Sequence, residues 1–137
     1  MDNIDTILLI DDDPGIHMVV DLPFEESPTQ LISCHSGLEA IEQAAHCTPQ
    51  LILQDRIMPN MSGVETIKQL KMFEHLSSIP IILMTATIDE QASEESQGVG
   101  ALGIIKKPFD PNTLIDQINH LYKNRNLQSC WLNQRKK

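Results

Sequence analysis

Strict alternation of short apolar runs with helical patterns is the feature that most constrains how this chain can fold. Five runs of four or five residues are typical of buried strands, and each is followed by a segment with helical spacing. Connections of this length require parallel strands with right-handed crossovers, so helices must cover both faces of the sheet. We therefore predict an α/β fold, a single doubly wound (βα)5 domain. The predicted strands are residues 6–10, 31–34, 51–54, 81–85 and 103–106.

The 137 residues fit one compact domain with no internal repeat. We expect the domain to span residues 1–123. Residues 124–137 are polar and end in Arg135, Lys136 and Lys137, which indicates a C-terminal tail or the start of a linker.

Two of the predicted helices have sequences that should make them less stable. Asp13 is expected to cap a helix that has Pro14 at its first position, and Pro23 should end or kink that helix early. A later segment, 89–97, has few residues to bury. They are Ile88, Ala92 and Val99.

Composition narrows the class of protein. The formal charge is 10 minus 19, or −9, which argues against direct binding to nucleic-acid backbones. The three cysteines lie in no C-x-x-C spacing and indicate reduced thiols. No apolar run approaches the ~18 residues of a membrane span, and the acidic N-terminus lacks the basic start of a signal peptide. We expect a cytoplasmic protein that binds neither nucleic acid nor membrane.

Polar side chains follow four of the five predicted strands. They are Asp11 and Asp12, Asp55, Thr85, and Lys107. Each has an ordinary interpretation by itself, because Asp favours turns, Thr favours strands and a lone Lys is usually solvated. Parallel strands, however, bring their carboxyl ends to one edge of the sheet, where ligands bind in open α/β folds.

Three clustered carboxylates raise one another's pKa, and a hard divalent cation such as Mg²⁺ relieves that repulsion. A hydroxyl and an ammonium at the same edge suit the oxygens of a phosphoryl group. A carboxylate nucleophile held beside them would form an aspartyl phosphate. The pattern therefore indicates phosphoryl chemistry.

Four motifs occur in order along the chain. They are Ile-Leu-Leu-Ile-Asp11-Asp12-Asp13-Pro14, Asp55-x-x-Met-Pro-x-Met-x-Gly63, Ile-Pro-Ile-Ile-Leu-Met-Thr85-Ala86 and Lys107-Pro108-Phe109. With these motifs the chain resembles the receiver domain of response regulators in two-component signalling, over residues 6–122. The resemblance implies a flavodoxin-like sheet with strand order 2-1-3-4-5.

The resemblance also implies roles for the residues at the sheet edge. Asp55 would accept a phosphoryl group from a phosphohistidine, and Thr85 and Lys107 would contact its oxygens. Lys107–Pro108 is expected to be a cis bond. The magnesium ligands implied are Asp11 (mainly through water), Asp12, Asp55 and the backbone carbonyl of Ile57.

The partners implied are a sensor histidine kinase or phosphotransfer protein and a downstream output protein or domain. A phosphorylation-dependent dimer is a further expectation. Output would pass through a surface formed by the fourth helix, fifth strand and fifth helix. Ile104 stands where the family usually carries an aromatic residue that responds to phosphorylation. Our hypothesis is that switching here works by loosening or re-docking the segment 89–97.

Other functions fit parts of the sequence. A haloacid-dehalogenase-like phosphatase would use Asp11 in the pattern Asp11-x-Asp13, but Gly15 departs from its motif and Asp55 is left unexplained. A receiver that is not phosphorylated and only binds partners is the second alternative. A flavodoxin would need a phosphate loop after the first strand, where three Asp residues would repel phosphate.

Overall fold

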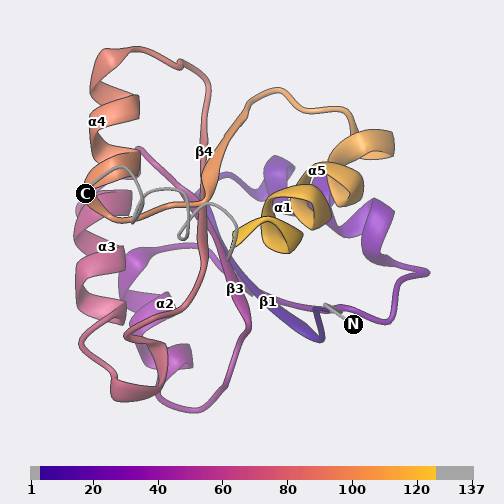
Figure 1. The fold of residues 1–137 in the computed structure, drawn as a ribbon. Coiled ribbons are helices and arrows are strands. Elements are labelled where there is room, and N and C mark those ends of the chain that lie inside the picture. The colour runs from indigo at the N-terminus through magenta and orange to yellow at the C-terminus, as the bar shows by residue number, and fades with distance from the viewer. Residues whose placement is uncertain (1–3, 126–137) are drawn as a thin grey trace.

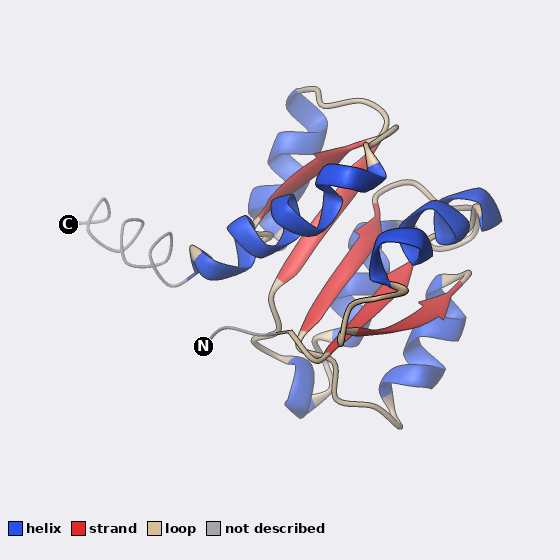
Figure 2. Ribbon diagram, turned by 90° about the vertical axis from the view of Figure 1, so that its right-hand side faces the viewer, coloured by secondary structure: helices blue, strands red, loops and turns tan. Residues whose placement is uncertain are grey.

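The computed structural model describes residues 4–125, which form five strands, five α-helices and one 3₁₀ helix in the predicted alternation (Figures 1 and 2). The strands are β1 (Thr6–Ile10), β2 (Gln30–Cys34), β3 (Leu51–Asp55), β4 (Ile81–Thr85) and β5 (Gly103–Lys106). The helices are α1 (Pro14–Phe24), α2 (Gly37–Ala44), α3 (Gly63–Leu70), η1 (Glu74–Leu76), α4 (Glu90–Gly98) and α5 (Pro111–Lys123).

All strand pairs are parallel and the order is β2-β1-β3-β4-β5, as expected. Helices α2, α3 and α4 cover one face of the sheet, and α1 and α5 cover the other (Figure 1). The register pairs Ile10 with Gln54, Asp55 with Met84, and Thr85 with Lys106. The carboxyl ends of four strands therefore meet at one edge.

Two aliphatic cores lie on the two faces of the sheet. Successive residues of β1 alternate between them: Leu8 and Ile10 pack beneath α2 and α3, whereas Ile7 and Leu9 face α1 and α5. All four are fully buried. This two-sided burial explains why the strand is apolar without alternation.

The N-terminal cap of α1 is confirmed, because the Asp13 carboxylate accepts a hydrogen bond from the Gly15 backbone N–H at 2.8 Å. The helix ends close to Pro23, one residue later than expected. Pro23 lies inside the last turn and the helix continues to Phe24. Phe24 is buried in the core beneath α1, and this burial offsets the hydrogen bond that Pro23 cannot donate.

Helix α4 forms where expected, but only part of its predicted packing is correct. Ala92 and Val99 are buried, whereas Ile88 is 50% exposed because it lies in the loop before the N-cap residue Asp89. Ser96 is buried in addition.

Helix α5 ends at Lys123, followed by the described residues Asn124 and Arg125. The rest of the predicted tail, 126–137, lies outside the described residues. Within 4–125, no helix has both the length and the apolar character needed to cross a membrane.

Candidate functional site

Three carboxylates converge at the carboxyl edge of the sheet. Oxygen atoms of Asp11, Asp12 and Asp55 lie within 4.8 Å of one another. Asp11 is fully buried after β1, Asp55 is 5% exposed at the end of β3, and Asp12 is exposed. The structure thus brings these three predicted residues together at one edge of the sheet.

Lys107 joins the cluster from the loop after β5. Its Nζ donates to Asp11 Oδ2 at 2.6 Å and to Asp55 Oδ1 at 2.9 Å. Its backbone N–H donates to the Thr85 carbonyl at 2.8 Å, and the bond to Pro108 is cis, as expected. One cation thus bridges two of the three carboxylates.

At this edge the three carboxylates outnumber the single ammonium of Lys107. Burial, together with the nearby Asp11 charge, raises the pKa of Asp55 to about 7, although the hydrogen bond from Lys107 acts in the opposite direction. Burial disfavours the Lys107 ammonium, but hydrogen bonds and charges from Asp11 and Asp55 outweigh it and raise the pKa of Lys107. A hard cation with oxygen ligands fits this excess of negative charge.

The loop after β3 is held close to the strand by Gly63. The Gly63 N–H donates to the Arg56 carbonyl at 2.9 Å, and a Cβ at this position would lie 2.4 Å from the Asp55 carbonyl oxygen. Only glycine permits this approach. Within the loop Asn60 has a φ of 71°, a conformation that Asn tolerates better than most residues. The side chain of Ile57 is 68% exposed, and no hydrogen bond found in residues 4–125 uses its carbonyl.

Thr85 lies at the end of β4, next to the cluster, but its hydroxyl is engaged elsewhere. Oγ1 donates to the Thr87 carbonyl at 3.2 Å and accepts from the Thr87 N–H at 3.3 Å. It also accepts from Nη1 of Arg56 at 3.4 Å. The structure therefore brings Asp11, Asp12, Asp55 and Lys107 together, with Thr85 on the neighbouring strand.

Arg56 has no predicted role, yet it is 5% exposed and connects two elements. Besides Thr85, its guanidinium binds Glu95 of α4, with Nε–Oε1 at 3.2 Å and Nη2–Oε2 at 3.5 Å. The only signal in the sequence is a charged residue directly after a buried strand. Its partner is 39 residues away, so no local pattern could identify the pair.

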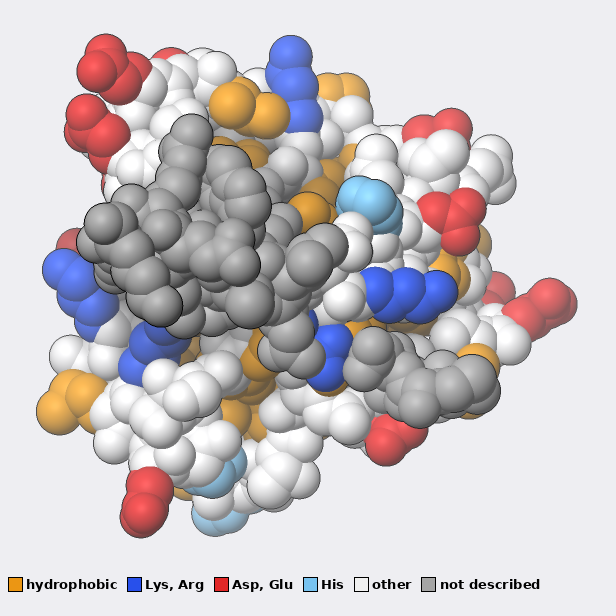
Figure 3. All heavy atoms as spheres, viewed as in Figure 1, with side chains coloured by type: hydrophobic (Ala, Val, Ile, Leu, Met, Phe, Trp, Pro, Cys, Tyr) orange, Lys and Arg blue, Asp and Glu red, His pale blue; other side chains and the backbone are white. Residues whose placement is uncertain are grey.

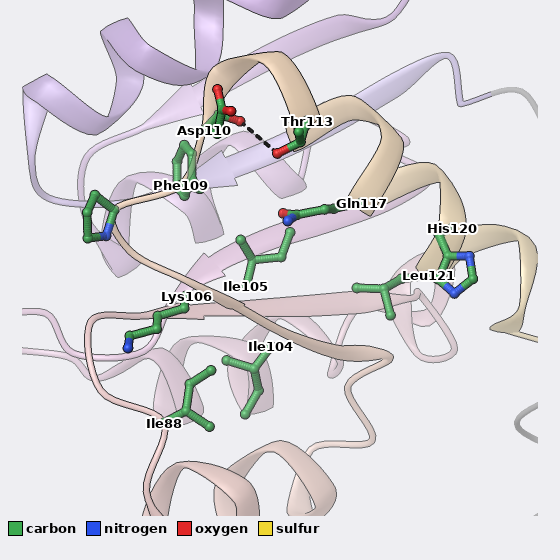
Figure 4. Close-up of a pocket in the computed structure, with 11 residues that line it drawn as sticks. Ile88, Ile104, Ile105, Lys106, Phe109, Asp110, Thr113, Gln117, His120 and Leu121 are labelled. Atoms are coloured by element: carbon green, nitrogen blue, oxygen red, sulfur yellow. Dashed lines mark hydrogen bonds between the residues drawn. The ribbon is translucent and has the colours of Figure 1, made fainter.

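A groove of ≈ 520 Å³ lies along β5, between the loop before α4 and helix α5. Ile88 and Ile104 reach it from the α4 side of the strand, and Ile105 and Gln117 from the α5 side (Figure 4). The space-filling view shows acidic side chains over α4 and hydrophobic atoms between α4 and α5 (Figure 3). This groove lies on the surface that the resemblance associates with output.

Asp13, which the phosphatase alternative pairs with Asp11, is engaged as the cap of α1. Asp11 instead accepts hydrogen bonds from Lys107 and from the Asp13 backbone N–H, at 2.6 and 2.9 Å. Both carboxylates therefore have roles that do not require a phosphatase motif.

Comparison with known proteins agrees with the geometry. The chain is 32% identical over 112 residues to sporulation initiation phosphotransferase F of Bacillus subtilis, covering 82% of this chain and 89% of that protein. It is 32% identical over 113 residues to the phosphate regulon transcriptional regulatory protein PhoB of Pseudomonas aeruginosa, covering 82% of this chain but only 49% of the longer relative.

Among solved structures, the chemotaxis protein CheY4 of Vibrio cholerae superposes with a TM-score of 0.81 at 27% identity, covering 87% of this chain and 99% of that one. The sequence model of the response regulator receiver domain matches residues 7–119. Receiver domains are phosphoacceptor modules that interact with histidine kinases or phosphotransfer proteins and with output domains. The chain belongs to the family of response regulator receiver domains.

Proposed function

We propose that Asp55 is the residue of this receiver that accepts the phosphoryl group from a phosphohistidine. The observation that carries the proposal is the placement of this buried carboxylate 2.9 Å from the Lys107 ammonium and beside Asp11 and Asp12. A carboxylate oxygen of Asp55 attacks phosphorus, the P–N bond of the donor breaks, and the imidazole leaves with the electron pair.

Lys107 and Thr85 stabilise the transferred group. The Lys107 ammonium already donates to Asp55, so an oxygen of the incoming phosphoryl group lies within its reach. The Thr85 hydroxyl donates to a second phosphoryl oxygen once it leaves the Thr87 carbonyl. Phosphoryl transfer depends mostly on such positioning and neutralisation of charge. The same groups support self-catalysed hydrolysis of the acyl phosphate.

The carboxylates of Asp11, Asp12 and Asp55, with the backbone carbonyl of Ile57, form the proposed magnesium site. Bound there, Mg²⁺ neutralises charge on the carboxylates and on the phosphoryl oxygens. Burial, with a smaller contribution from the Asp11 charge, raises the pKa of Asp55, and this supports the assignment because a bound cation would favour the ionised carboxylate.

The switched surface is proposed to be the surface of α4, β5 and α5 that includes this groove, with an output protein, an output domain or a second copy of the chain as its partner. We place the receiver itself at residues 1–123, followed by a tail or linker, and expect it to act in the cytoplasm with its kinase or phosphotransfer protein.

The test is incubation with acetyl phosphate and Mg²⁺, followed by intact-mass analysis. The wild-type protein should gain one phosphoryl group, and Asp55→Asn or removal of Mg²⁺ with a chelator should abolish the gain. Asp13→Asn is the matched control, because Asn caps helices as well as Asp and the adduct should persist. An adduct that survives in Asp55→Asn would contradict the proposal.

A further inference from the structure

The buried guanidinium of Arg56 stands between the site and helix α4. It follows Asp55 in sequence, and the Arg56 backbone N–H donates to the Met84 carbonyl at 2.9 Å, which ties it to the strand that carries Thr85. Its side chain then contacts the Thr85 hydroxyl on one side and the Glu95 carboxylate on the other.

The first contact determines what the Thr85 hydroxyl can do. A hydroxyl has one proton and two acceptor lone pairs. Donors from Arg56 and the Thr87 backbone N–H approach both lone pairs, at 3.4 and 3.3 Å. Thr85 is therefore left to act as a donor, which is the polarity that an anionic phosphoryl oxygen requires.

The second contact makes α4 depend on Arg56. Helix α4 itself buries only Ala92 and Ser96, so its apolar attachment is small. The Arg56 side chain is 6% exposed and the Glu95 side chain 25%. A buried cation is costly without its partner, so Arg56 and Glu95 should move together.

We propose that Arg56 is a positioning residue that orients the Thr85 hydroxyl toward the phosphoryl group and transmits this contact through Glu95 to α4. The inference rests on the proposed phosphorylation of Asp55. When the hydroxyl leaves the Thr87 carbonyl for a phosphoryl oxygen, the long contact to Nη1 of Arg56 changes, and Glu95 follows the guanidinium with its helix. Ile104 lacks the ring that performs this task in the family, and the Arg56–Glu95 pair supplies another connection.

The experiment compares amide hydrogen exchange of α4 before and after treatment with acetyl phosphate and Mg²⁺, with the adduct followed by intact mass. In the wild type, exchange at residues 90–98 should change about fivefold, the factor expected for the net contribution of one hydrogen bond. In Arg56→Met and Glu95→Gln, the change should fall below about twofold although the adduct still forms.

The two variants separate positioning from transmission. Arg56→Met should also slow phosphoryl uptake, because the Thr85 hydroxyl loses a donor that orients it. Glu95→Gln should leave the rate of uptake unchanged, because Glu95 does not contact Thr85 or the carboxylates.

Two further variants control for simple loosening of the helix. Lys71 donates from Nζ to the Val99 carbonyl at 2.8 Å, so Lys71→Met should speed exchange in α4 in both states but keep the response to phosphorylation. Glu94→Gln removes the same charge from the exposed neighbour of Glu95 and should behave as wild type.

A full α4 response in both Arg56→Met and Glu95→Gln, with the adduct present, would overturn this inference and leave the role of Asp55 intact. Absence of an adduct on the wild type would overturn the proposed function and this inference together. If Arg56→Met does not fold, Glu95→Gln decides the question by itself.

Discussion

Helices α3 and α4 cover the same face of the sheet, yet they are attached to it in different ways (Figure 1). Helix α3 buries four residues, Gly63, Thr66, Ile67 and Leu70, and its first residue lies directly against the backbone of β3. Helix α4 buries two small residues, Ala92 and Ser96. Its other attachments include polar contacts from Arg56 to Glu95 and from Lys71 to the Val99 carbonyl.

The two kinds of attachment differ in how easily they let a helix move. Apolar and backbone packing of α3 fixes the loop beside Asp55, and close-packed contacts resist displacement. Directional polar contacts of α4 can be exchanged for others when a charge arrives nearby. We infer that α3 maintains the geometry of the site and that α4 reports its state.

The largest effect on stability is expected from a substitution that disrupts the anchoring of α3 to the end of β3. In Gly63→Ala, the new Cβ would lie 2.4 Å from the Asp55 carbonyl oxygen and 2.9 Å from the Arg56 Cα, both backbone atoms that cannot rotate away. We expect a loss of about 2–4 kcal/mol in the free energy of unfolding, measured by urea denaturation. A loss below about 1 kcal/mol would show that α3 is not anchored in this way.

The next effect concerns the carboxylates that α3 helps to hold. Because the folded-state pKa of Asp55, about 7, lies above its ordinary value of 3.8, the folded protein binds more protons than the unfolded one between these values. Without a divalent cation, the stability of the wild type should therefore rise as pH falls from 8 to 5.

Asp55→Asn should remove most of this pH dependence and raise metal-free stability at pH 8 by about 2 kcal/mol. Thermal unfolding across this pH range, with and without Mg²⁺, measures both effects. Mg²⁺ should stabilise the wild type more than the variant. Equal stabilisation of both proteins would argue against Asp55 as a ligand.

A smaller loss of stability is expected when the polar attachment of α4 is altered. Glu95→Gln leaves the buried Arg56 cation with a neutral partner and should cost about 1 kcal/mol, since Glu95 is partly exposed and Gln retains an acceptor. Urea denaturation measures the cost. Glu94→Gln should cost nothing measurable, and a similar cost for both would assign the effect to net charge.

The smallest expected effect is a gain in stability. A Cβ added to Gly98 meets no heavy atom within 4 Å, and Ala is a better helix former than Gly. Gly98→Ala should stabilise α4 by about 0.5–1 kcal/mol and slow its amide exchange. Destabilisation by this change would mean that the end of α4 needs the freedom of glycine.

Much of this organisation could be predicted from the sequence. Apolar runs ending in Asp11, Asp55 and Thr85 predict both the strands and the edge where they meet, because parallel strands align their carboxyl ends. The strand order came from the resemblance, since periodicity does not specify which strands are neighbours.

What could not be predicted depends on tertiary packing. Pro23 remains in α1 because Phe24 is buried, and Ile88 is exposed because it lies in the loop before the N-cap residue Asp89. The pairing of Arg56 with Glu95 requires α4 to bring Glu95 against the residue that follows β3, which no local pattern encodes.

The central claim is that the phosphoryl group is carried by Asp55, and borohydride reduction of the acyl phosphate followed by peptide mass analysis tests it most directly. Reduction converts a phosphorylated Asp to homoserine and so marks the modified residue. We predict homoserine at position 55, in the peptide that contains the loop up to Gly63. Homoserine at Asp11, Asp12 or Asp13, with position 55 unmodified, would contradict the account.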